Sequence, residues 1–152
     1  MQHNTHALVI NSQNTSNRSG ANVNSYTYYI NWDSVLPQIN KDKAQTFNLS
    51  WTLKSVSTAT VLNKNAIVSI NFGRSNTFDQ TNSQSSVIGY IFPQICGTNY
   101  YFTSSTFDNI KTVLTYPSSN FITITFSDFL TSTAFVMYDY VLILNFEPIE
   151  NK

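Results

Sequence analysis

Hydrophobic and polar residues alternate along most of this chain with a period of two, and the 3.6-residue period of an amphipathic helix is nearly absent. The alternating segments are rich in Val, Ile, Thr, Tyr and Phe, and Asn, Ser, Gly and Pro bound them. Both features are typical of short strands that bury one face. We therefore predict strands over residues 7–11, 26–32, 45–57, 66–72, 87–92, 99–103, 110–116, 121–126 and 136–146.

The longest alternating segment runs over residues 45–57 and contains Trp51. Its large apolar residues share one face as far as Leu53, and the polar residues between them share the other. Trp51 lies on the apolar face and is expected in the core. The next apolar residue, Val56, is out of step with Leu53, which predicts a β-bulge between them.

Eight or nine short strands with almost no helix predict an all-β fold, an antiparallel sandwich of two sheets. A single jelly roll of about eight strands is the leading topology, and an immunoglobulin-like Greek key is the second. One helical turn is expected over residues 33–36, before Pro37. Residues 12–24 have Val23 as their only large apolar residue, so residues 1–24 are predicted to form an extended N-terminal arm with one short strand. Residues 25–152 would then form the sandwich.

The composition is polar but uncharged. Ser, Thr and Asn supply 56 of the 152 residues, whereas there are eight basic and eight acidic residues and the net charge is zero. A soluble domain usually has about a quarter charged residues. Neutral amides and hydroxyls cost less to bury than ions do, so such a surface suits contact with other protein. The absence of a basic cluster argues against nucleic acid as a partner.

Residues for catalysis are scarce. His3 and His6 lie in the predicted tail, Cys96 has no His near it in the sequence and cannot form an intrachain disulfide, and no Gly-rich phosphate loop occurs. Asp139 is a candidate for one of a glycosidase's two carboxylates, but a polar residue on an edge strand is the simpler interpretation. We expect no enzymatic activity, no metal and no cofactor. No apolar run is long enough to insert in a membrane, and the start does not resemble a secretory signal.

The aromatic residues are the remaining candidates for recognition. Trp32, at the end of a predicted strand, is a candidate platform for a sugar ring or a partner. Tyr29 and Tyr101 each belong to an adjacent tyrosine pair, so one of each pair faces away from the core. For any single tyrosine, a half-buried place in the sandwich is the simpler interpretation. Together with Asn14 and Arg18 of the predicted arm, these three residues form the candidate interface.

The opening of the chain resembles a known group of proteins. Leu8-Val9-Ile10-Asn11-Ser12-Gln13-Asn14, then Arg18-Ser19, then Asn24-Ser25-Tyr26-Thr27-Tyr28-Tyr29-Ile30 are similar to the start of small minor capsid proteins of large icosahedral nucleocytoplasmic DNA viruses. The resemblance covers residues 8–37, with a wider gap between Asn14 and Arg18 than in those proteins. It implies a jelly-roll-like subunit that sits among or beneath the major capsid capsomers and holds them together, in a virion assembled in the host cytoplasm.

The leading hypothesis is therefore a structural virion protein, a minor capsid or cement subunit. Its partners would be major capsid capsomers, other minor capsid proteins and copies of itself. The alternative is a carbohydrate-binding or receptor-binding β-sandwich module like a fibre tip, which requires two or three coplanar exposed aromatic rings on one sheet face. An enzyme with an unrecognised active site is the third and weakest hypothesis.

Overall fold

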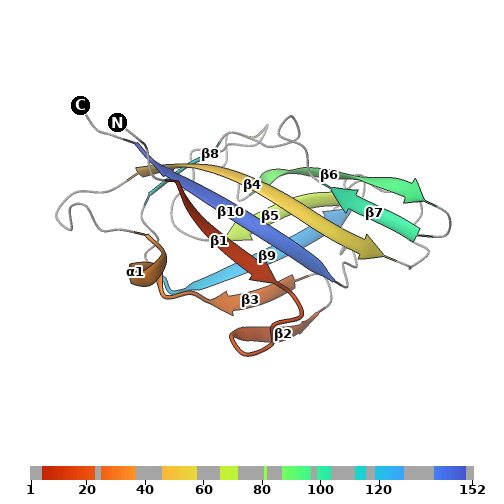
Figure 1. The fold of residues 1–152 in the computed structure, drawn as a ribbon, viewed down its shortest axis with the longest axis horizontal. Helices are drawn as coiled ribbons and strands as arrows, with labels where there is room; N and C mark the ends of the chain where they lie inside the picture. The colour runs from red at the N-terminus through yellow and green to blue at the C-terminus, as the bar shows by residue number, and fades with distance from the viewer. Residues whose placement is uncertain are drawn as a thin grey trace.

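The computed structural model describes residues 5–22, 25–36, 46–57, 66–71, 81, 87–96, 99–103, 112–115, 119–128 and 139–149. These residues form ten strands and one helical turn (Figure 1): β1 (His6–Asn11), β2 (Arg18–Asn22), β3 (Ser25–Tyr29), α1 (Trp32–Val35), β4 (Thr46–Ser57), β5 (Ala66–Asn71), β6 (Val87–Cys96), β7 (Asn99–Thr103), β8 (Thr112–Thr115), β9 (Phe121–Asp128) and β10 (Tyr140–Pro148). The prediction of a β fold with almost no helix is confirmed for this part of the chain. It has ten strands where about eight were expected.

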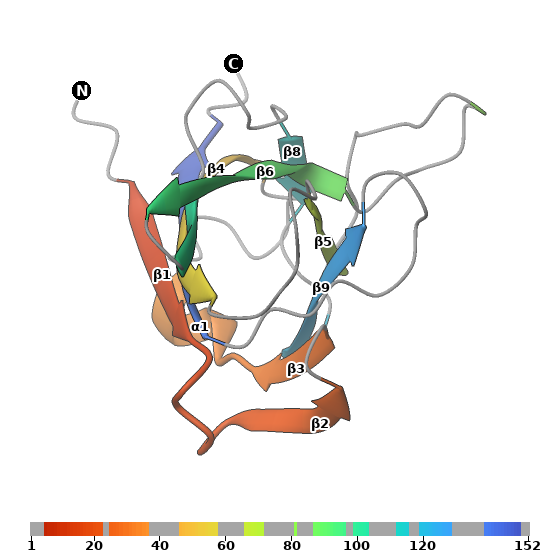
Figure 2. The same ribbon diagram turned by 90° about the vertical axis from the view of Figure 1, so that its right-hand side faces the viewer.

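The strands form two antiparallel sheets, as predicted. Sheet A has the order β1-β10-β4-β7, and β8 also pairs with β4. Sheet B has the order β2-β3-β9-β5-β6. The end-on view shows β1 and the β2–β3 pair at the open side of the sandwich, with α1 near them (Figure 2). The two sheets thus face each other around a common interior.

Strand β6 joins the two sheets. Its first half, residues 87–91, pairs with β5 of sheet B, and its second half, residues 92–96, pairs with β7 of sheet A (Figure 2). The prediction that this strand ends before Pro93 is wrong, because Pro93 lies within β6 opposite Phe102. Proline lacks the N–H that a ladder uses, yet strands tolerate it where that donor is not needed. Pro93 follows directly after the point at which β6 stops pairing with β5 and begins to pair with β7.

The core lies between the sheets and follows the alternation of the sequence. In β10 every second residue from Tyr140 to Phe146 is buried, and the facing strand β9 buries Ile122, Ile124 and Phe126. Trp51 is 1% exposed, as predicted, and its Nε1 donates a hydrogen bond of 2.9 Å to the carbonyl of Ile88. Each such large side chain contributes about 1.5–3 kcal/mol on burial. This bond also ties β4 of sheet A to β6 of sheet B.

The predicted bulge in β4 does not occur in the described pairing. Strand β4 keeps one register with β10 from Phe47 to Ser55, so the inward position after Leu53 belongs to Ser55. Ser55 is buried, and its hydroxyl donates a hydrogen bond to the carbonyl of Asp139. A serine can occupy an inward position when its hydroxyl has a partner there. The sequence pattern suggested a shift in strand register because Ser55, the inward residue after Leu53, is polar.

The predicted N-terminal arm is wrong for residues 6–22, because both strands in this segment pair with the sandwich. Strand β1 pairs with β10 along its whole length, and β2 pairs with β3. Strand β2 has a register shift between Ser19 and Asn22, where Gly20 adopts a positive φ of 105°. A side chain is strained at that φ, whereas glycine accepts it. Strand β2 is not predicted from the sequence because it extends the sheet edge with main-chain bonds and carries no large apolar residue.

Candidate interaction surface

Trp32, the candidate platform, is part of the core. It is 2% exposed, and its Nε1 donates a hydrogen bond of 2.7 Å to the carbonyl of Ser119. Its ring meets Phe146 of β10 edge to face, with centroids 5.8 Å apart. The predicted surface role of Trp32 is therefore wrong. The helical turn α1, which begins at this residue, directs the indole between the two sheets.

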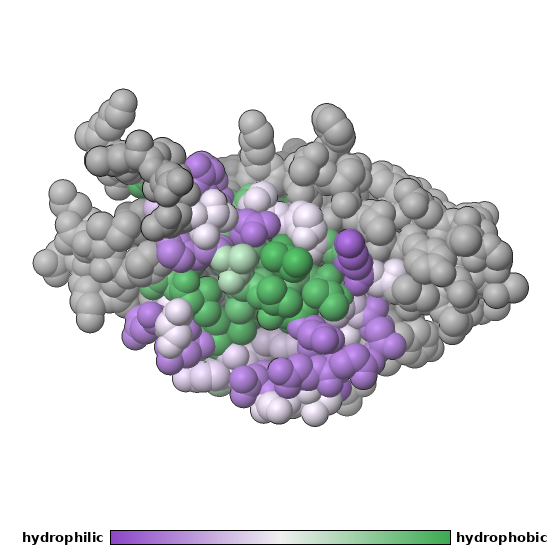
Figure 3. All heavy atoms as spheres, in the orientation of Figure 1, coloured by the Kyte–Doolittle hydropathy of each residue, from purple (hydrophilic) through white to green (hydrophobic). Residues whose placement is uncertain are grey.

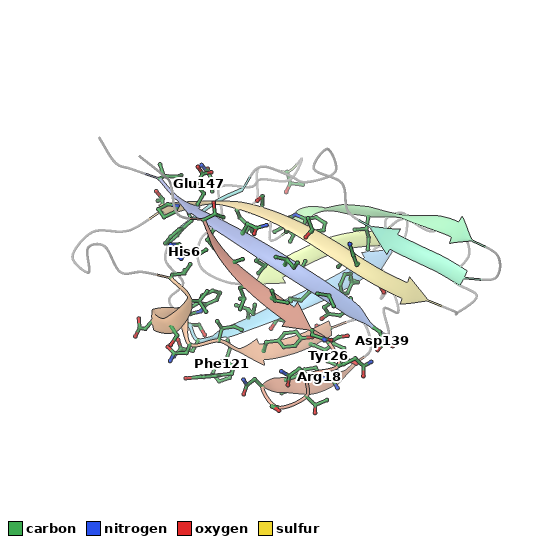
Figure 4. All side chains as sticks on the ribbon, viewed as in Figure 1. His6, Arg18, Tyr26, Phe121, Asp139 and Glu147 are labelled. Atoms are coloured by element: carbon green, nitrogen blue, oxygen red, sulfur yellow. The ribbon has the colours of Figure 1, made fainter. Side chains whose placement is uncertain are left out.

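Arg18, predicted as an interface residue, makes contacts within the protein. Its guanidinium lies 4.2 Å from the centroid of the Tyr26 ring, and its Nη1 donates a hydrogen bond to the carbonyl of Ser12. A cation over an aromatic face is attracted by the negative π face of the ring. Figure 4 shows Arg18 and Tyr26 together on the lower side of the fold, with Asp139 near them. Arg18 thus fixes the turn between β1 and β2, and it is half-buried.

Asn14 is exposed and lies in that turn. Its Oδ1 accepts a hydrogen bond of 3.2 Å from the backbone N–H of Ser16, and the Oδ1 of Asn11 accepts one of 3.0 Å from the N–H of Gln13. Such bonds from Asn to the backbone two residues later stabilise tight turns. The abundance of asparagine in this segment therefore has a local structural use, while the exposed side of Asn14 stays a candidate contact.

A buried tyrosine pair lies next to Arg18. The hydroxyls of Tyr28 in β3 and Tyr140 in β10 are 2.8 Å apart and hydrogen-bonded, so they join sheet B to sheet A. Burial raises the pKa of Tyr28, and burial together with the hydrogen bond to Tyr28 raises the pKa of Tyr140. Both phenols therefore stay protonated at neutral pH. The pair is suited to holding the sheets together and unsuited to nucleophilic or base catalysis.

Tyr29 is exposed, as an interface residue must be. It is 45% exposed and packs edge to face against Phe121 of β9, which is 56% exposed, with centroids 5.6 Å apart. Figure 4 shows Phe121 on the outside of the fold. Phe121 was not among the predicted interface residues, although its alternation with Ile122 places it on the polar face of the strand. Tyr101, the remaining candidate, lies in β7 opposite Val56, and its side chain is outside the described part of the structure.

The outer face of sheet B continues from this aromatic pair as rows of hydroxyls. Thr27 Oγ1 lies 2.9 Å from Thr123 Oγ1, and Ser25 Oγ lies 3.1 Å from Thr125 Oγ1. These residues stand directly opposite each other across β3 and β9. Hydrogen bonds between opposite hydroxyls stabilise a strand pair. The described outward side chains of this strand pair thus form a face without charge.

The outer face of sheet A carries a patch that we call the apolar strip, formed by Ala7, Val9, Val141 and Ile143. Val9 is 60% exposed and stands opposite Ile143 across β1 and β10, while Val141 and Ile143 are half-buried. Figure 3 shows hydrophobic residues in the middle of this face, over β1 and β10, with hydrophilic residues around them. Exposed apolar patches with a polar rim often mark contact sites.

The neighbours of the apolar strip are mostly neutral. On β4 the residues opposite Val141, Ile143 and Asn145 are Lys54, Thr52 and Ser50. All three are exposed, so they form the polar border on that side. Lys54 is the one charged residue in these three rows. A partner covering the apolar strip would bury few charges.

Catalytic and metal-binding residues are not grouped in the described part of the chain. No cluster of three or more His, Cys, Asp or Glu occurs there. His6 belongs to β1 and not to a tail, and Asp139 precedes β10, which is a central and not an edge strand. Asp139 is exposed and accepts a hydrogen bond from the amide of Gln13. Within the described ranges no helix is both long and apolar enough to cross a bilayer.

A comparison with protein-family models found no match, and a comparison with curated proteins found no significant match.

Proposed function

We propose that this protein is a structural virion protein, a minor capsid or cement subunit that binds neighbouring capsomers. The observation that carries the proposal is the apolar strip, an exposed hydrophobic patch on a sheet face whose surroundings are nearly uncharged. Covering apolar area is favourable by about 25 cal/mol per Å². Burying the neutral hydroxyls and amides around it costs less than burying ions. The resemblance of residues 8–37 to minor capsid proteins supports the same role.

We further propose that the fold is a jelly roll with two added strands. The support is a nested set of antiparallel pairs: β1 with β10, β3 with β9, β4 with β7 and β5 with β6. Such a set is a long hairpin, and the pairing of β10 with β4 and of β5 with β9 rolls it up into two sheets. Jelly rolls of eight strands in two sheets occur in viral capsid and lectin domains. Strands β2 and β8 lie outside the set.

The proposed mechanism uses two faces. The apolar strip would be covered by one neighbouring subunit, and the hydroxyl rows of sheet B with Tyr29 and Phe121 would contact another. Tyrosine is enriched at interfaces because its ring is apolar and its hydroxyl can form a hydrogen bond. A subunit with contact faces on both sheets can hold two neighbours together, as a cement protein must.

The alternative glycan-binding function has less support from the described aromatic residues. The exposed pair Tyr29 and Phe121 has an interplanar angle of 70°, so the two rings do not form the flat platform on which sugar rings stack. Trp32, the other candidate for stacking, is buried.

The test compares incorporation into particles. Val9→Thr/Ile143→Thr removes apolar contact from the strip but keeps β-branched residues on both strands. We expect this variant to fold normally and to be incorporated at least tenfold less than the wild type when it is co-expressed with the capsid proteins of its source. The matched control, Val9→Ile/Ile143→Val, keeps the strip apolar and should be incorporated normally. Equal incorporation of all three proteins, or absence of the wild type from purified particles, would refute the proposal.

A further inference from the structure

Strand β1 lies at the end of sheet A and leaves part of its main chain without a described partner. The N–H of Ser12 donates a hydrogen bond of 3.0 Å to the carbonyl of Tyr140. Every second residue before Ser12 in β1, namely Ile10, Leu8 and His6, therefore directs its N–H and C=O groups toward β10. In an antiparallel strand the residues between these point their N–H and C=O groups to the other side. These residues are Ala7, Val9 and Asn11.

Asn11 already uses its outward carbonyl, which accepts a hydrogen bond of 3.0 Å from the N–H of Asn14 in the following turn. The open stretch of the edge is therefore short. It consists of the N–H and C=O groups of Ala7 and Val9, and no described residue hydrogen-bonds to them.

Strand β1 itself lacks the sequence features with which strands usually prevent pairing, although α1 lies close to it. Proteins block free edges with lysine, proline, bulges or a covering element. The sequence of β1, His-Ala-Leu-Val-Ile-Asn, contains no Lys, Pro or acidic residue, and its register with β10 has no shift. Within the described ranges β10 is its only strand partner. The exposed Val9 adds apolar surface at this edge.

We propose that β1 pairs antiparallel with β1 of a second copy of this chain, so that sheet A continues across a two-fold axis. The spacing of the outward groups determines the register. Ala7 of each copy stands opposite Val9 of the other and exchanges both main-chain hydrogen bonds with it, while Leu8 stands opposite Leu8 at the axis. Every outward donor and acceptor of the open stretch then has a partner.

Three observations favour a second copy over a foreign strand. The open stretch offers only two residues, and the same stretch of another copy matches them in number and spacing. Strand β1 contains no Lys, Arg, Asp or Glu and the chain has no net charge, so two copies do not repel each other. The apolar strips of the two copies also become continuous, since Val9 of one copy adjoins Ala7 of the other. An isologous contact of this kind closes as a dimer.

This inference does not depend on the proposed function, since β1 would pair in the same way outside a capsid. The first test is the mass of the full-length protein in solution over a range of concentrations. Val9→Pro removes the outward N–H but no hydrogen bond to β10, so we expect a folded protein whose dimer dissociation constant rises at least tenfold. Val9→Thr keeps the N–H and the branched side chain, so its dimer dissociation constant should rise much less than that of Val9→Pro.

The second test measures the register and does not rely on a proline variant that folds. Opposite residues that do not exchange hydrogen bonds have Cα atoms about 4.5 Å apart, within the range of a disulfide. In a Cys96→Ser background, Leu8→Cys should form a covalent dimer under mild oxidation. Val9→Cys in the same background should not, because Val9 faces Ala7 of the other copy.

The proposal would be overturned if the wild type stayed monomeric up to about 1 mM, because a dissociation constant above that concentration means very weak binding. Dimerisation of Val9→Pro at the wild-type affinity would also overturn it. Cross-linking through Val9→Cys but not Leu8→Cys would overturn the proposed register. Failure to enter particles would leave these results unchanged, so the two proposals fail separately.

Discussion

At the scale of single residues, the hydrogen bond between the buried hydroxyls of Tyr28 and Tyr140 links the two sheets through the core. Tyr140 also packs edge to face on Phe126 of β9, with centroids 5.0 Å apart. Burial raises the pKa of both phenols, because the charged form would lose its hydration. The pair therefore couples stability to alkaline pH.

We predict that the free energy of unfolding falls as the pH rises above about 10. Above that pH the unfolded chain releases the two tyrosine protons, whose normal pKa is about 10, while the folded protein retains them. Below it, the stabilising contribution is fully present. The expected slope is at most about 1.4 kcal/mol per pH unit for each tyrosine. Urea unfolding between pH 8 and pH 11 measures it.

The double variant Tyr28→Phe/Tyr140→Phe should lose less stability over this pH range than the wild type. Replacing both partners leaves no unpaired hydroxyl, so its stability at pH 8 should stay close to normal. Tyr29→Phe, which removes an exposed hydroxyl, is the matched control and should follow the wild-type curve. A double variant with the wild-type pH dependence would contradict the assignment to this pair.

The residue scale also shows where sequence reasoning succeeded. The strict alternation in β4 placed Trp51 in the core correctly. Trp32 was misplaced because it lies in a four-residue helical turn, where two-residue alternation carries no information on burial. Phe121 shares the outward face of β9 with half-buried threonines. An aromatic residue at a strand end is equally compatible with burial, so the sequence did not single it out.

At the scale of elements, the β1–β2 turn determines whether the N-terminus is an arm or part of the sandwich. Ser12 is 1% exposed, and its Oγ accepts a hydrogen bond of 2.9 Å from the N–H of Tyr140. The N–H of Tyr29 donates one of 2.9 Å to the carbonyl of Asn17. These bonds attach the turn to both sheets. Hydrophobic patterning does not detect them, because main-chain and hydroxyl groups make them.

Trypsin provides a direct measurement, since Arg18 is the only Lys or Arg before Lys41. We predict slow cleavage after Arg18 in the folded protein, because the side chain is held against Tyr26 and the strand is paired. Ser12→Ala leaves the Tyr140 N–H without this acceptor, at a cost of about 1–3 kcal/mol, and should accelerate cleavage at least fivefold. Thr5→Ala, at an exposed position before β1, is the control. If the wild type were cleaved at the rate of an unfolded peptide, the result would support the predicted N-terminal arm.

At the scale of the whole molecule, the two faces of β10 have different tasks. Leu144 is fully buried between the sheets, whereas its neighbour Ile143 belongs to the apolar strip. We predict that Leu144→Ala costs about 2–5 kcal/mol because it leaves a cavity in the core. Ile143→Ala should cost about 1 kcal/mol or less, because solvent already reaches this residue. Thermal and urea unfolding of the two variants measure the difference, and equal losses would mean that the strip is part of the core.

Much of the architecture was predictable, since strand positions and the two-sheet arrangement follow from alternation and turn residues. The partners of each strand were not. The pairing of β10 with both β1 and β4 depends on contacts between distant segments, and several strands have similar patterns. The pairing of β6 with both β5 and β7 was also not predictable, because a proline such as Pro93 usually marks the end of a strand.

The nested pairing has a consequence for biosynthesis. The first described strand, β1, leaves the ribosome long before its partner β10, because chains grow at about 5–20 residues per second. Topologies dominated by such distant contacts fold slowly. The nascent chain therefore exposes the sequence of β1 until β10 has been synthesised. A premature stop codon before residue 140 would leave β1 without its ladder and β4 without its main neighbour, so the truncated product should depend on chaperones or be degraded.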